Sequence, residues 1–204
     1  MDFNIAVGGS KGGTGKTSLS INLIRPLGVR HVVDADPHTG ISDILALNPD
    51  PGAIPTFQAI QSAKELERLL KNKTGILVDC GGFDSDVNRE ALINADVIIY
   101  PTNDDPTEQK GLSDFNGLLQ YLSDKSGKKI IAHAVITRVH PSRNRFDDYI
   151  AGINEMSNMK AFPVVIPSSA RVVAAMFSGS GVKSGTIAAK YSLLAKHIME
   201  AALK

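Results

Sequence analysis

The chain is poor in cysteine, in long apolar runs and in net charge, and each shortage excludes a class of protein. Cys80 is the only cysteine, so no disulfide can form within the chain, and we expect a reducing, cytoplasmic environment. No apolar run approaches the roughly 20 residues that span a bilayer. Asp2 and Asn4 interrupt the start, which is unlike a targeting segment. With 204 residues, 43% of them apolar, the chain suits a single domain over residues 1–204.

The net charge of only +1 hides an uneven distribution. Residues 1–124 hold 10 lysines and arginines against 17 aspartates and glutamates, whereas residues 125–204 hold 12 against 4. A basic half on a nearly neutral protein favours a polyanionic partner. Charges scattered over a solvated surface remain the alternative explanation.

The most informative segment is glycine-rich, with the sequence GGSKGGTGKTS over residues 8–18, and it follows the apolar run 3–7. A strand that enters such a loop and then a helix is the arrangement of a phosphate-binding loop. Glycines let successive amides point at phosphate oxygens, and the helix N-terminus adds a partial positive charge. We expect Lys16 to reach the β- and γ-phosphates and the Thr17 hydroxyl to ligate Mg²⁺. The predicted nucleotide-binding residues of this loop are Lys11, Gly12, Gly13, Thr14, Gly15, Lys16, Thr17 and Ser18.

Two apolar segments end in carboxylates that suit a metal site. Residues 31–38 read HVVDADPH and contain Asp34 and Asp36, and residues 75–82 read GILVDCGG and contain Asp79. In α/β sheets the chemistry gathers at the carboxyl ends of the strands. We expect Asp79 to hold a Mg²⁺-bound water, as in a Walker B strand. Taken alone, the first pair of aspartates also suits a helix-capping turn.

Strand-like and helix-like segments alternate along the whole chain. The pattern predicts an α/β fold with a mostly parallel sheet and helices on both faces. In residues 40–60 it predicts only a short amphipathic turn at 41–47 and loops. A flexible loop at 179–185 precedes a terminal helix, whose residues Tyr191, Leu194, Ala195, Ile198 and Leu203 we expect to pack on the core. The expected strands are 3–7, 31–36, 75–79, 95–101, 128–137 and 161–167, and the expected helices are 17–27, 63–70, 85–93, 105–122 and 168–177.

The segment KGGTGKT at residues 11–17 resembles the deviant Walker A motif of the ParA/MinD family of P-loop ATPases. Residues 31–38 and 76–82 are similar to two further segments of that family. The resemblance implies that Lys11 reaches across a dimer interface to the partner's nucleotide and that Asp36 polarises the attacking water, so Lys11, Lys16 and Asp36 form the catalytic set. It also implies that Asp34 supports the Mg²⁺ shell and that Thr137 and Arg138 help to surround the adenine of ATP. His38 stands where the family has glutamine.

Within the family, the chain resembles most the short ParA-type (ParF-like) partition ATPases. This implies slow, partner-stimulated and Mg²⁺-dependent ATP hydrolysis, and an ATP-sandwiched homodimer that binds DNA non-specifically. With a ParB- or ParG-like centromere-binding protein, such a dimer partitions plasmids or chromosomes, and we expect it to be associated with the nucleoid. The candidate DNA contacts are Arg171, Lys183 and Lys190.

Three alternatives use the same fold. The first is a MinD-like ATPase on membrane, although the terminal helix lacks the dense basic face of a membrane-binding helix, and we expect no membrane partner. The second is an ATPase that positions a protein assembly. The third is a small-molecule ligase, which would leave Lys11 unexplained. One cysteine per chain excludes the usual nitrogenase-reductase-like carrier, and the sequence has no guanine-reading N-K-x-D motif.

Overall fold

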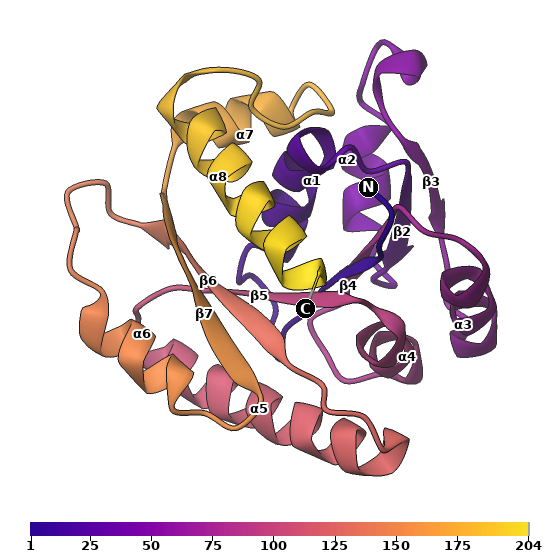
Figure 1. Cartoon of the computed structure of the whole chain (residues 1–204). Helices are drawn as coiled ribbons and strands as arrows, with labels where there is room; N and C mark the ends of the chain where they lie inside the picture. Colours follow the sequence, from indigo (N-terminus) through magenta and orange to yellow (C-terminus); the bar gives the residue numbers. More distant parts are fainter. Residues whose placement is uncertain (204) are drawn as a thin grey trace.

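The protein is described by a computed structural model that covers residues 1–203. Its centre is a seven-stranded, fully parallel sheet in the order β3-β2-β4-β1-β5-β6-β7 (Figure 1). The first strand of the chain therefore lies in the middle of the sheet, next to the strand that carries Asp79. The strands are β1 (Ile5–Val7), β2 (His31–Ala35), β3 (Thr56–Ala59), β4 (Ile76–Cys80), β5 (Val97–Thr102), β6 (Ala132–Val139) and β7 (Met159–Pro167).

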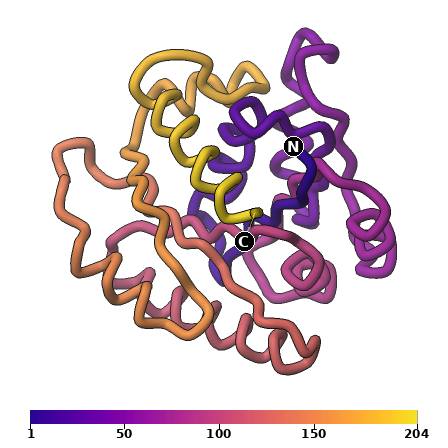
Figure 2. Tube along the Cα trace, in the orientation of Figure 1, coloured from indigo at the N-terminus to yellow at the C-terminus, as the bar shows by residue number. Residues whose placement is uncertain are grey.

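Helices cover both faces of the sheet, which confirms the predicted fold class (Figure 1). One face carries α3 (Ala63–Asn72), α4 (Asp86–Asn94), α5 (Pro106–Ser126) and α6 (Asp147–Asn154). The other carries α1 (Lys16–Leu27), α2 (Gly40–Leu45), α7 (Ala170–Met176) and α8 (Gly185–Ala202). Each face has its own apolar cluster, and the strands between them are apolar on both sides because both sides are covered. In Figure 2, α8 lies across α1, and the two helices are in contact.

Side-chain caps define most of the predicted helix starts. The hydroxyls of Ser62, Ser85 and Ser169 accept amide hydrogens at the starts of α3, α4 and α7. Asp105 caps α5 by accepting from Thr107 N, and Pro106 follows at the first helical position. At the other end of α1, Gly28 adopts φ 62°, a left-handed conformation that favours glycine, so the helix ends at Leu27, as the sequence predicts.

Strand register brings the predicted functional segments to one edge of the sheet. Val7 of β1 pairs with Asp79 of β4, and Asp79 pairs with Asp34 of β2. The phosphate-loop segment, the Asp79 segment and the Asp34–Asp36 segment therefore leave three adjacent strands at the same end. This is the carboxyl edge, where open α/β sheets bind ligands.

Two elements are not predicted by the sequence pattern. The sequence predicts a loop where β3 lies, because Pro49, Pro51, Gly52 and Pro55 interrupt the segment; in the structure three of the four residues of β3 are exposed. It forms as an edge strand by pairing with β2. α6 is short and buries only Ile153 among its eight residues, so its apolar period is weak. In addition, β6 starts at Ala132 rather than at residue 128.

The C-terminal region corrects two further expectations. Tyr191, Leu194, Ala195 and Ile198 are buried as predicted, but Leu203 is 88% exposed because it follows the last helical turn. The segment 179–185 is an anchored loop, not a free one. The Asn22 side chain accepts from Val182 N at 2.9 Å, and the Asn48 side chain donates to the Gly179 carbonyl at 3.1 Å.

Candidate nucleotide-binding site

The glycine-rich loop between β1 and α1 has the backbone of a phosphate site. Gly13 and Gly15 have φ of 76° and 94°, which residues with a side chain rarely adopt. A Cβ added at Gly12 or Gly13 would meet nothing within 4 Å, so these glycines border open space. α1 begins immediately after the loop and has no side-chain cap, which leaves its first amides free for an anion. An anionic phosphate chain fits this arrangement.

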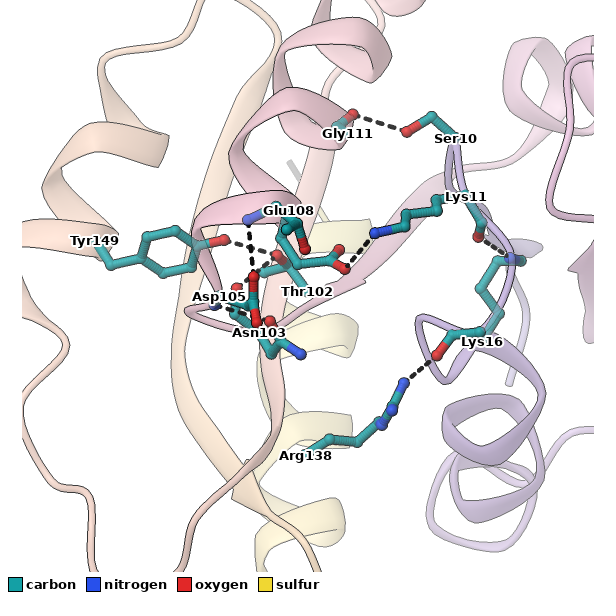
Figure 3. A network of polar contacts seen from close by, with 12 residues as sticks. Ser10, Lys11, Lys16, Thr102, Asn103, Asp105, Glu108, Gly111, Arg138 and Tyr149 are labelled. Atoms are coloured by element: carbon teal, nitrogen blue, oxygen red, sulfur yellow. Dashed lines mark hydrogen bonds and ion pairs between the residues drawn. The ribbon is translucent and has the colours of Figure 1, made fainter.

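The two lysines of the loop are placed differently. Lys16 is buried, and its ammonium crosses the loop to donate to the Lys11 carbonyl at 2.9 Å. Burial lowers the pKa of Lys16, although the carboxylates of Asp79 and Asp36 oppose that shift. The Lys11 side chain is 49% exposed and extends from the loop toward α5, where its ammonium lies 3.6 Å from Glu108 Oε1 (Figure 3). Lys16 therefore serves its own loop, and Lys11 lies on its rim.

Asp79 organises the metal side of the site. Its two carboxylate oxygens accept hydrogen bonds from Thr17 Oγ1 at 2.8 Å and from Ser20 Oγ at 2.6 Å. Complete burial raises the pKa of the Asp79 carboxyl to about 7, against the effect of these two hydrogen bonds, and the neighbouring Asp34 raises it further. The sequence carries no signal for this role of Ser20, because the contact needs α1 to pack against β4.

A hydroxyl and a carboxylate beside a phosphate loop are the oxygen donors that Mg²⁺ prefers. Within residues 1–203 no group of three or more His, Cys, Asp or Glu side chains could hold a metal ion on its own. A magnesium ion at Thr17 and Asp79 would therefore complete its coordination with nucleotide phosphates and water, as Mg²⁺ commonly does.

The two aspartates after β2 have different roles. Asp34 is fully buried, and its oxygens accept from Asp36 N at 3.2 Å and from Ser42 N at 2.9 Å. Both Asp34 oxygens thus accept from backbone amides and shape the loop, and the support of the Mg²⁺ shell by Asp34 stays a prediction. Asp36 is only half-buried, and its Cγ lies 3.5 Å from the position of a Cβ on Gly81. His38 is exposed, and its backbone amide donates to Asp36 Oδ1.

The loop after β4 touches the phosphate loop. A Cβ on Gly82 would lie 2.9 Å from both the N and the Cα of Gly12, so only glycine permits this approach. The buried Asn88 of α4 holds the loop from behind, since its amide donates to the carbonyl of Phe83 at 2.7 Å and accepts from Gly81 N at 3.3 Å. This role of Asn88 is not predictable from the sequence, because a single asparagine in a helix carries no signal of which groups its side chain will bind.

A cavity of about 810 Å³ opens beside the start of α1. Thr137 is buried and donates to the Thr102 carbonyl at 3.3 Å. Arg138 adopts φ 60°, and its guanidinium donates to the Gly13 carbonyl (Figure 3). Both predicted base-binding residues therefore line the space next to the phosphate loop, and a flat, apolar base suits its walls. Residues that share the cavity but were not predicted include Ile166, Pro167, Ser168, Ser169 and Val172.

The three candidate DNA contacts differ in exposure and in their hydrogen bonds. Arg171 and Lys183 are exposed, and the Arg171 guanidinium lies against Ser184, the residue after Lys183. Lys190 is half-buried, and its ammonium donates to the Val165 carbonyl of β7 at 2.9 Å. One of the three donors of this ammonium is thus used within the chain, and DNA binding by Arg171, Lys183 and Lys190 stays a prediction.

Comparison with known proteins agrees with this geometry. The family model described as the CobQ/CobB/MinD/ParA nucleotide binding domain matches residues 5–182. No curated protein sequence matches the chain significantly.

Several solved structures share the fold. McdA of Cyanothece in complex with ATP superposes with a TM-score of 0.77 at 15% identity, covering 98% of this chain and 96% of that one. MinD of Pyrococcus horikoshii with Mg-ADP superposes with a TM-score of 0.72 at 18% sequence identity, covering 99% of this chain and 98% of that one. A putative plasmid partition protein of Borrelia burgdorferi bound to AMPPNP superposes with a TM-score of 0.69 at 16% sequence identity, covering 99% of this chain and 98% of that one. With the family model spanning most of its length, the chain belongs to the CobQ/CobB/MinD/ParA family of nucleotide-binding domains.

Proposed function

We propose that this protein is a Mg²⁺-dependent ATPase that closes into an ATP-sandwiched homodimer and, as a dimer, binds DNA non-specifically to partition a plasmid or chromosome. One observation carries the proposal: the loop holds two lysines, and only Lys16 is buried in it. Lys16 suffices for phosphate binding within one chain. Lys11 is half-exposed on the rim, which supports a role for it toward a nucleotide held by a second chain.

Catalysis would consist of positioning and charge neutralisation. The loop amides, the α1 N-terminus and the Lys16 ammonium would bind the phosphates, and bound Mg²⁺ would neutralise charge that develops on them. Thr17 and Asp79 would hold the ion. Asp36, half-buried beside Gly81, is placed to orient a water toward the terminal phosphate. The 81–82 segment lies against Gly12, so it would respond to the presence of the γ-phosphate.

ATP as the nucleotide is supported by the ligands of the neighbours, which are ATP, Mg-ADP and AMPPNP in the three structures compared. The 810 Å³ cavity also supports nucleotide binding, because it lies beside the phosphate loop, next to Arg138, and has room for the base. A base docked there would meet the Arg138 side chain, which now covers Gly13 and Gly15.

DNA partition is supported by the basic half of the chain and by the Arg171–Lys183 pair of exposed cations. Each phosphate contact releases counterions, so a dimer, which doubles the number of contacts, binds much more tightly than a single chain and is more sensitive to salt. A ParB- or ParG-like centromere-binding protein would then stimulate hydrolysis and release the dimer. We place the protein in the cytoplasm, on the nucleoid.

A second candidate is a MinD-like ATPase that positions its cargo on a membrane or protein assembly. The observation that favours it is a set of exposed apolar side chains in and just after α8: Leu193, Met199 and Leu203, which are 48%, 40% and 88% exposed. In residues 1–203 no helix has the length and apolar character needed to cross a bilayer.

The test measures binding to a non-specific DNA duplex by fluorescence anisotropy, with ATP, with ADP and without nucleotide, over a series of salt concentrations. We expect salt-sensitive binding with ATP alone, and we expect sedimentation velocity to show a dimer under the same condition. Lys11→Ala should still bind ATP but lose both the dimer and the DNA. Lys110→Ala on exposed α5 surface is the matched control and should behave like the wild type.

DNA binding that is equal in all three nucleotide states would contradict the proposal. An ATP-dependent dimer that ignores DNA but co-sediments with liposomes would support the second candidate. Normal dimers of Lys11→Ala would remove the role given to Lys11.

A further inference from the structure

The contact between Lys11 and Glu108 joins the rim of the phosphate loop to the first turn of α5 (Figure 3). Lys11 Nζ and Glu108 Oε1 are 3.6 Å apart, and the two side chains are 49% and 9% exposed. Glu108 is therefore a nearly buried carboxylate, and the ion pair closes over it from the solvent side. In residues 1–203 the ion pair with Lys11 is the one salt bridge that Glu108 makes.

The usual structural role of a glutamate at this position does not apply. Glu108 is the third residue of α5, where a glutamate commonly reaches back to the backbone amide of the N-cap residue. Here that amide, Asp105 N, donates instead to the side chain of Asn103 at 2.9 Å. The cap itself is made by Asp105, which accepts from Thr107 N. Glu108 is thus not needed to start the helix.

The surroundings of Glu108 make its dependence on a cation strong. Its second oxygen, Oε2, is buried and has no hydrogen-bond partner within the described residues. The Tyr100 hydroxyl is also buried nearby without a hydrogen-bond partner of good geometry. A buried carboxylate that loses its ion-pair partner keeps its desolvation cost and loses most of the compensating attraction, although the Lys16 ammonium also lies near enough to attract Glu108. Moving Lys11 away from Glu108 therefore has a cost, which a more strongly charged anion can offset.

We infer that Glu108 is a positioning residue that holds Lys11 within its own chain and thereby sets how much negative charge a partner's nucleotide needs to form the dimer. This inference rests on the sandwich dimer of the proposed function. In the dimer the Lys11 ammonium leaves the single negative charge of Glu108 for the phosphates of the partner's nucleotide. ATP carries one more phosphate than ADP, so ATP overcomes the hold of Glu108 and ADP does not. Glu108 thus makes dimerisation selective for the triphosphate.

The test replaces Glu108 with glutamine, which keeps the size and removes the charge. Sedimentation velocity measures the dimer dissociation constant with ATP, with ADP and without nucleotide. We expect Glu108→Gln to dimerise at least tenfold more tightly than wild type with ATP and also to form dimers with ADP. The ratio of the dimer dissociation constant with ADP to that with ATP should therefore fall. Glu155→Gln, an exposed glutamate after α6, is the matched control and should keep the wild-type ratio.

The double variant Lys11→Ala, Glu108→Gln shows whether the gain passes through Lys11, and we expect it to form no dimer with either nucleotide. Glu108→Asp keeps the charge and should retain the preference for ATP. An unchanged ratio of ATP to ADP affinities in Glu108→Gln would overturn the inference. So would ADP-dependent dimers of the double variant.

A second measurement does not need the dimer. Lys11→Ala leaves Glu108 without its ion-pair partner, so we expect its melting temperature without nucleotide to fall by more than that of Lys110→Ala. Equal melting temperatures would overturn the inference, even if Glu108→Gln fails to fold. If the wild type forms no dimer with ATP, the proposed function fails, and the melting temperatures still report separately on the Lys11–Glu108 contact.

Discussion

Replacing Asp79 with asparagine should stabilise the metal-free protein at pH 8 and remove its stabilisation by Mg²⁺. The Asp79 carboxyl is completely buried, it lies next to Asp34 in the sheet, and burial raises its pKa to about 7. Ionised Asp79 is therefore costly until a metal ion arrives. Asparagine can still accept a hydrogen bond from Ser20 or Thr17, and it carries no charge.

The magnitude follows from the pKa difference between the folded and unfolded chains. The ordinary pKa is 3.8 and the folded one is about 7. At about 1.4 kcal/mol per pKa unit, ionising Asp79 in the folded protein costs up to about 4 kcal/mol. Because the folded state binds this proton more tightly, the free energy of unfolding falls as pH rises from about 4 to about 7 and is constant above that. Between pH 5 and pH 8 the loss is about 2–3 kcal/mol, or roughly 5–10 °C for a domain of this size.

The assay is thermal unfolding at pH 5, 6, 7 and 8 with a chelator present, followed by the same series with Mg²⁺ and ATP. Between pH 5 and pH 8 we expect the melting temperature of the wild type to fall by about 5–10 °C more than that of Asp79→Asn. When Mg²⁺ and ATP are added at pH 8, the melting temperature of the wild type should rise by more than that of Asp79→Asn. Asp148→Asn, on the exposed surface of α6, is the control. Parallel pH curves for the wild type and Asp79→Asn would refute the reasoning.

Three other substitutions test different parts of the molecule. Gly82→Ala places a Cβ 2.9 Å from Gly12. It should weaken ATP binding at least about tenfold by calorimetry, or roughly 1.4 kcal/mol, and unchanged affinity would contradict the close approach. Thr17→Ala removes a predicted Mg²⁺ ligand and should lower the hydrolysis rate by roughly 100-fold, whereas a near-normal rate would exclude Thr17 from the metal site. Asn4→Ala deletes a buried side chain that donates to the Leu70 carbonyl and accepts from Ile76 N. It should cost about 2–4 kcal/mol in urea unfolding, and a loss below ~1 kcal/mol would contradict its structural role.

The sequence by itself determined the phosphate loop and the class of the fold. Gly13 and Gly15 need left-handed backbone, and Lys16 and Thr17 follow them directly, so every element of the loop lies within a few neighbouring residues. The apolar strands and the serine and aspartate caps are equally local signals, and the predicted alternation of strands and helices was confirmed. Asp34, Asp36 and Asp79 were predicted at strand ends for the same reason.

The tertiary structure alone decided what those residues touch. The contacts of Asp79 with Thr17 and Ser20 span 62 and 59 residues of chain, and Arg138 reaches Gly13 across 125. Such contacts depend on strand order and helix packing, which no local pattern encodes. The same holds for β3, which is a strand only because β2 lies beside it, and for Lys190, whose ammonium donates to the Val165 carbonyl of β7. Glu108 is a further example, because its pairing with Lys11 exists only once α5 packs beside the phosphate loop, and there a helix-cap glutamate becomes the counter-ion of the rim lysine.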